Sequence, residues 1–100
     1  MLVEHTKPPI PAGYVAVASV TNATAQALTV PDDARYAIVK AITAPVRFRD
    51  DGTEPTSVSG YSVATNGEVI LTSRKQLDDF RVIAVDTTAS LEVLFYKISE

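Results

Sequence analysis

The chain has 100 residues, a formal net charge of -3 and no cysteine, which excludes disulfides and thiolate metal sites. This length is typical of one domain, and a cysteine-free chain suits synthesis in a reducing cytoplasm. The nine basic residues are scattered among twelve acidic ones. Because nucleic-acid binding depends on clustered positive charge, we expect no nucleic-acid partner. No apolar run approaches the roughly 20 residues of a membrane helix, so we expect no membrane partner.

Residues 1–13 predict an extended N-terminal arm that is rich in proline. Pro8, Pro9 and Pro11 lack a backbone N–H and hold φ at about -65°, so this stretch cannot join a central strand or a helix. Polyproline-like extension is the expected conformation. Two interpretations stay open: a tail in solvent, or an arm that lies over a neighbouring subunit. The second gives the candidate contact residues Lys7, Pro8, Pro9 and Ile10.

Residues 14–100 predict one all-β domain. Short segments rich in Val, Ile, Tyr and Thr alternate with turn residues about every ten positions, which is typical of an antiparallel β-sandwich or jelly roll. The expected strands are about eight in number and cover 14–21, 26–30, 35–42, 45–49, 59–63, 68–73, 80–85 and 90–98. Only residues 73–79 have helical character, with Ser73 as the N-cap.

Two turn signals separate these segments. Asn66-Gly67 stands between two strand-like runs, and because both residues tolerate positive φ we predict a hairpin with a type I′ turn. Asp51-Gly52 permits a tight turn, and Pro55 then excludes the following stretch from a central strand.

Residues 46–56, VRFRDDGTEPT, form the densest patch of charge in the chain. Asp50 and Asp51 could serve as a carboxylate pair for acid–base hydrolysis, or as a weak surface cation site, although their spacing is not that of an EF-hand. The structural alternative places Arg47 and Arg49 on the polar face of the strand, where they pair with carboxylates of a neighbouring strand or another chain. We favour the structural alternative, and we expect no catalytic site, no metal and no cofactor.

Other chemistry-bearing residues are few. His5 is the only histidine, and the four glycines stand singly at turns, so no phosphate-binding loop is visible. The four tyrosines could form an aromatic platform for a glycan, or could be half-buried strand residues. They are Tyr14, Tyr36, Tyr61 and Tyr96.

Several expected strands are apolar on both faces. In 90–98, one face carries Leu91, Val93 and Phe95, and the other carries the candidate contact residues Leu94, Tyr96 and Ile98. The same holds for 35–42 and for 80–85. A two-layer sandwich has one core, so apolar outer faces must be covered by the arm or by another subunit. We therefore predict a homo-oligomer, a dimer or trimer; coverage of such strands by the chain's own loops is the alternative.

Residues 44–96 resemble a set of small structural proteins of tailed bacteriophages and prophages. The resemblance lies in an aromatic-Arg-Asp-Asp-Gly segment followed by Pro-Thr at 48–56, in Gly67-Glu68 opening a strand, and in a closing strand with Phe95-Tyr96. It implies a β-sandwich or jelly-roll protein of the virion that decorates or cements the capsid shell. It also implies a location on the capsid surface and a partner in the major capsid protein or another virion protein. The alternative is a tail or fibre accessory module that binds a host-surface glycan.

Overall fold

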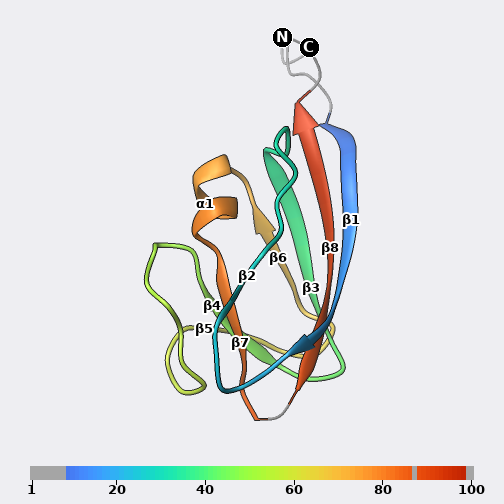
Figure 1. Cartoon of the computed structure of the whole chain (residues 1–100). Helices are drawn as coiled ribbons and strands as arrows, with labels where there is room; N and C mark the ends of the chain where they lie inside the picture. Colours follow the sequence, from blue (N-terminus) through green and yellow to red (C-terminus); the bar gives the residue numbers. More distant parts are fainter. Residues whose placement is uncertain (1–8, 87, 99–100) are drawn as a thin grey trace, which may run out of the picture.

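The computed structural model describes residues 9–86 and 88–98, in which eight strands and one short helix form two facing sheets (Figure 1). The elements are β1 (Pro9–Val20), β2 (Gln26–Ala27), β3 (Tyr36–Ile42), β4 (Val46–Arg49), β5 (Tyr61–Val63), β6 (Glu68–Leu71), α1 (Arg74–Asp79), β7 (Arg81–Ala84) and β8 (Ala89–Ile98).

The strand order is that of a jelly roll. The first sheet has the order β1-β8-β3-β6 and the second has the order β2-β7-β4-β5. The pairs β1–β8, β2–β7, β3–β6 and β4–β5 are all antiparallel, so the first strand pairs with the last and each later pair nests within the previous one. This nesting is the arrangement of two interleaved Greek keys. The predicted all-β antiparallel fold is confirmed.

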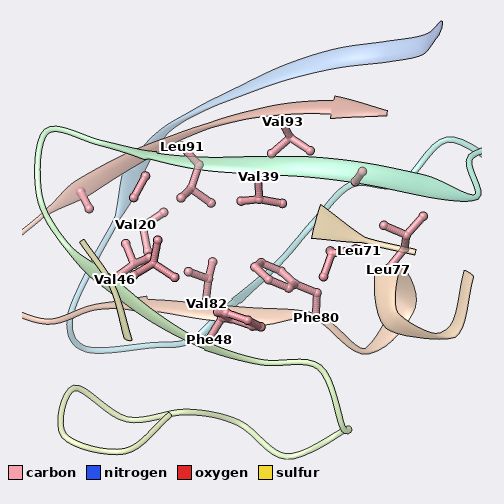
Figure 2. Close-up of a cluster of buried hydrophobic side chains, with 14 of the residues drawn as sticks. Val20, Val39, Val46, Phe48, Leu71, Leu77, Phe80, Val82, Leu91 and Val93 are labelled. Atoms are coloured by element: carbon pink, nitrogen blue, oxygen red, sulfur yellow. The ribbon is translucent and has the colours of Figure 1, made fainter. Parts of the chain in front are cut away.

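One apolar core fills the space between the sheets. Figure 2 shows Val39, Leu91 and Val93 of the first sheet pointing toward side chains of the second sheet, among them Val82. The alternation predicted for 90–98 produces this layer, because Leu91, Val93 and Phe95 are buried while the residues between them turn outward.

Helix α1 occupies the short segment that the sequence marked as helical. Ser73 has extended backbone, and its hydroxyl accepts a hydrogen bond from the Gln76 N–H at 3.2 Å, as expected of an N-cap. Leu77 is buried and anchors the helix to the core. The predicted helix and its cap are confirmed.

Removal of this cap should lower stability measurably. We expect Ser73→Ala to reduce the free energy of unfolding by about 1 kcal/mol, because the Gln76 N–H loses its acceptor. Urea denaturation measures the change, with Ser62→Ala, an exposed serine of β5, as the control. An equal effect of both substitutions would show that the cap contributes nothing.

Part of the predicted N-terminal arm belongs to the first sheet. It is extended as predicted, but β1 begins at Pro9 and not at residue 14, and Pro9, Ile10 and Pro11 pair with Ile98, Lys97 and Tyr96. β1 is an edge strand, so a missing proline N–H on its open side breaks no ladder hydrogen bond. Lys7 and Pro8 lie outside the described residues.

The predicted Asn66-Gly67 hairpin is wrong. A turn is present, since the Gly67 N–H donates to the Ala64 carbonyl at 2.8 Å, but of these two residues only Asn66 has positive φ, at 69°. The turn links β5 to β6, which belong to different sheets. β5 pairs with β4, the strand before it in the chain, and β6 pairs with β3.

Candidate functional site

The outer face of the first sheet carries an apolar row that crosses all four strands. Tyr14 of β1 lies opposite Leu94 of β8, Leu94 lies opposite Ile38 of β3, and Ile38 lies opposite Ile70 of β6. Tyr14, Leu94 and Ile70 are 56%, 43% and 64% exposed. Isolated apolar residues are common on protein surfaces, but a continuous row marks a contact surface.

A second row extends this surface toward the end of the sheet where β1 begins. Tyr96 of β8 lies opposite both Pro11 of β1 and Tyr36 of β3, and the exposed Ile98 follows two residues later on β8. Three of the four tyrosines therefore share one face. We call the whole surface the apolar face; it consists of Pro11, Tyr14, Tyr36, Ile38, Ile70, Leu94, Tyr96 and Ile98.

The apolar face is hollowed on one side. A depression of about 330 Å³ is lined by five residues, all of them on β3 or β6 except Tyr96. Ile38 and Ile70 belong to its lining, while Tyr14 and Leu94 stand on the opposite half of the sheet. The depression therefore lies on one half of the face, and Tyr14 and Leu94 lie on the other half.

A charged band borders the apolar face on the side away from Ile98. Glu92 of β8 lies opposite Lys40 of β3, which lies opposite Glu68 of β6, and opposite charges in cross-strand positions attract. Partial burial raises the pKa of the Tyr14 hydroxyl, and the Glu92 carboxylate, which accepts its hydrogen bond, raises that pKa further. The charged band comprises Glu92, Lys40 and Glu68.

Both edges of the first sheet are protected against strand addition. β1 carries Pro11 and shows irregular register between Pro11 and Gly13 and between Val17 and Val20. The opposite edge strand, β6, has only four residues and begins with Glu68. Prolines, bulges, charge and short length all prevent edge-to-edge pairing. The open surface of this sheet is therefore its face.

The charged loop of 46–56 is organised by its two arginines. Val46 and Phe48 are buried, and Arg47 and Arg49 take the other face of β4, as predicted. Arg47 donates to the carbonyls of Ser57 and Gly60 at 3.2 and 2.9 Å, so its partners are main-chain oxygens and not the expected carboxylates. Its role is to hold the β4–β5 connection; contact of Arg47 with another chain stays a prediction.

Arg49 forms the charged pair, and its partner lies two residues away. Its Nε donates to Asp51 Oδ1 at 3.1 Å, which keeps the pair within one segment and does not join two strands. Gly52 follows with φ of 87°, and the chain bends at residues 51–53, where Asp51-Gly52 permits a tight turn. As with Arg47, contact of Arg49 with another chain stays a prediction.

The aspartates of this loop do not have the environment of an acid–base pair. Asp50 accepts a hydrogen bond from Gln76 Nε2 at 2.9 Å. The hydrogen bond from Arg49 lowers the pKa of Asp51, which is opposite to the shift that a general acid needs. In residues 9–86 and 88–98, no group of three His, Asp or Glu side chains could hold a metal ion.

The Asp51 shift predicts a pH dependence. Because the folded-state pKa of Asp51 lies below its ordinary value of 3.8, the pair stabilises the fold above that pH and loses its effect as the pH falls through the lowered pKa. Asp51→Asn should therefore be slightly less stable than the parent at neutral pH and equal to it in stronger acid. Thermal unfolding across pH measures the difference, with Glu54→Gln as the control; a difference that grows in acid would contradict the assignment.

The second sheet does not repeat the exposed apolar face. Ile83 of β7 lies opposite Arg47 on the outer side of this sheet, yet it is only 4% exposed within the single chain. The expectation that the outer apolar side of 80–85 needs a partner is therefore wrong, because the chain covers that side itself.

A hollow of about 510 Å³ lies beside the exposed Tyr61 on the second sheet, between its ring and the residues of the charged loop. Arg49, Asp50 and Asp51 belong to its lining. Tyr61 is separated from the other tyrosines, so the four do not form one platform.

Of the candidate contact residues, Leu94, Tyr96 and Ile98 lie together on the apolar face, and Arg47 and Arg49 lie on the other sheet. Tyr14, Ile38 and Ile70 were not among the candidates. The signal for Ile70 was present, since Glu68–Leu71 is apolar at positions of both faces.

No helix in the described part of the chain is long and apolar enough to cross a membrane. Comparisons with models of protein families, with curated proteins and with solved structures found no match.

Proposed function

We propose that this protein is a non-enzymatic structural component of a tailed-bacteriophage virion. It decorates and cements the capsid shell by binding, as a homo-oligomer, between subunits of the major capsid protein. The apolar face is the observation that carries the proposal, because it exposes more tyrosine and aliphatic surface than a lone two-layer protein needs. The resemblance of residues 44–96 supplies the class of partner. The jelly-roll fold serves many functions, so the fold alone does not identify the class of partner.

A cementing role requires that the protein bind the shell, and it requires no catalysis. A protein that binds the assembled shell, and does not bind its separated parts, stabilises the shell by mass action. Aromatic side chains are enriched at such interfaces and charged ones are depleted at their centres, which is the composition of the apolar face. Many modest contacts repeated around a shell reinforce one another.

The test compares particles with and without the protein. Particles that lack it should release their DNA at a lower temperature, and added parent protein should restore the original temperature. Leu94→Asp should fail to restore it, because it places a carboxylate in the apolar face. Val58→Asp is the matched control and should restore it, because Val58 is 83% exposed but lies in the β4–β5 connection of the second sheet. Equal heat resistance of both particles would contradict the role.

The hollow beside Tyr61 favours a second candidate, a module that binds a host-surface glycan. An exposed aromatic ring next to a guanidinium and carboxylates offers both stacking and hydrogen bonds to a sugar. A glycan array should then show binding that Tyr61→Ala abolishes and Tyr36→Ala preserves, because Tyr36 lies on the other sheet. An array without any binding would dismiss this candidate.

A further inference from the structure

We propose that the apolar face binds a second copy of this chain, around a two-fold axis that runs parallel to the strands between β8 and β3. This dimer is the homo-oligomer of the proposed function. It rests on the proposed function only because both involve the apolar face. In this dimer β8 lies over the partner's β3, and β1 lies over the partner's β6. Sheets that face each other with nearly parallel strands pack in the ordinary aligned manner of a β-sandwich.

Charge complementarity selects this axis. Glu92 and Lys40 occupy opposite positions on β8 and β3, the two strands that flank the axis. The two-fold operation therefore places Glu92 over the partner's Lys40, and Lys40 over the partner's Glu92. An axis in the same plane but perpendicular to the strands, through the row of Leu94, would instead place the charged band over tyrosines. Electrostatic complementarity of this kind fixes the register of an interface.

Shape complementarity favours the same axis. Tyr14 and Leu94 lie on β1 and β8, outside the depression, and the depression lies mainly on β3 and β6. The two-fold operation places Tyr14 over the partner's Ile70 and Leu94 over the partner's Ile38. Each copy would thus fill the depression of about 330 Å³ in the other.

The area is sufficient for a dimer. The four strands have 12, 10, 7 and 4 residues, and at about 3.3 Å per residue and about 4.8 Å per strand they give a face of roughly 500 Å² per copy. Two copies together bury about 1,000 Å², the area that a specific interface with good complementarity needs. The protected edges β1 and β6 leave this face as the route of association for the first sheet.

The axis has a consequence for shell binding. Because it is parallel to the strands, both copies place Pro9, the first residue of β1, at the same end of the dimer. A dimer that presents the same end of both copies to a shell can contact two neighbouring subunits at once, with an enhanced effective concentration.

Sedimentation equilibrium tests the dimer with the full chain. The parent should sediment at twice the single-chain mass of 10.7 kDa. Lys40→Glu alone places Glu over Glu, and Glu92→Lys alone places Lys over Lys, so each variant should dimerise with a dissociation constant raised by about tenfold or more. An equimolar mixture should regain dimers, because each interface then joins Glu to Lys. The charges within each chain are unchanged by mixing, so this rescue reports only on contact between chains.

Val58→Asp should keep the parent mass, and Leu94→Asp should sediment as a single chain. A single-chain or trimeric parent, or a mixture no more dimeric than its components, would overturn the proposal. If the parent is a dimer but does not change the stability of the particles, the dimer proposal is supported and the virion role is contradicted. If the parent is a single chain and its Leu94→Asp variant no longer binds particles, the dimer proposal is wrong and the apolar face binds the shell.

Discussion

Replacement of Val93 by Asp is expected to prevent folding, whereas the same replacement of its neighbour Leu94 is expected to leave the fold intact. Val93 is 0% exposed and lies in the core between the sheets, so a carboxylate there loses its hydration without a partner. Such burial costs several kcal/mol, a large part of the roughly 5–15 kcal/mol that stabilises a domain. Leu94 points to the opposite side of β8, where water can hydrate the new charge.

Circular dichroism and thermal unfolding of the two variants at low concentration measure this contrast. Val93→Asp should show no cooperative transition, and Leu94→Asp should unfold cooperatively. The comparison matters for the interface, because it shows that any loss of association in Leu94→Asp occurs without loss of fold. Loss of fold in both variants would mean that Leu94 contributes to the core.

Replacement of Phe80 by Ala should lower the free energy of unfolding by about 3–5 kcal/mol. Phe80 follows helix α1, is fully buried, and stacks on Phe48 with ring centroids 5.2 Å apart. Truncation to Ala removes both its apolar contacts and this aromatic pair, and leaves a cavity where α1 meets the second sheet.

Urea denaturation measures the effect, and Phe80→Leu is the matched control because it keeps most of the volume. The leucine variant should lose clearly less stability than the alanine variant. A loss below about 1 kcal/mol for Phe80→Ala would show that the site collapses around the missing ring, or that Phe80 is not central to the core.

Local patterns predicted most of the elements. Alternation in Val46–Arg49 and in 90–98 correctly separated core from outer positions, because a side-chain period of two depends on the strand alone. Ser73 correctly marked the helix, because an N-cap acts on residues next to it in sequence. The apolar outer side of β8 was also visible, since Leu94, Tyr96 and Ile98 alternate with core residues.

Pairing between distant strands could not be predicted in the same way. Asn66-Gly67 satisfied the local rule for a hairpin, but the core directs β5 and β6 to different sheets. Tyr14 and Ile70 join the apolar face only through the registers of β1 with β8 and of β3 with β6. The burial of Ile83 could not be predicted either, because it lies opposite Arg47, and Arg47 bonds to carbonyls ten or more residues away in the sequence.

Hydroxyl-radical footprinting of Tyr14 and Tyr61, read by mass spectrometry, tests most directly whether the apolar face is a protein contact surface. Both rings are exposed in the single chain, but only Tyr14 lies on the apolar face. We predict that oxidation of Tyr14 falls as protein concentration rises and stays low on particles, while oxidation of Tyr61 does not change with concentration. Oxidation of Tyr14 that is as independent of concentration as that of Tyr61 would contradict a contact role for the apolar face.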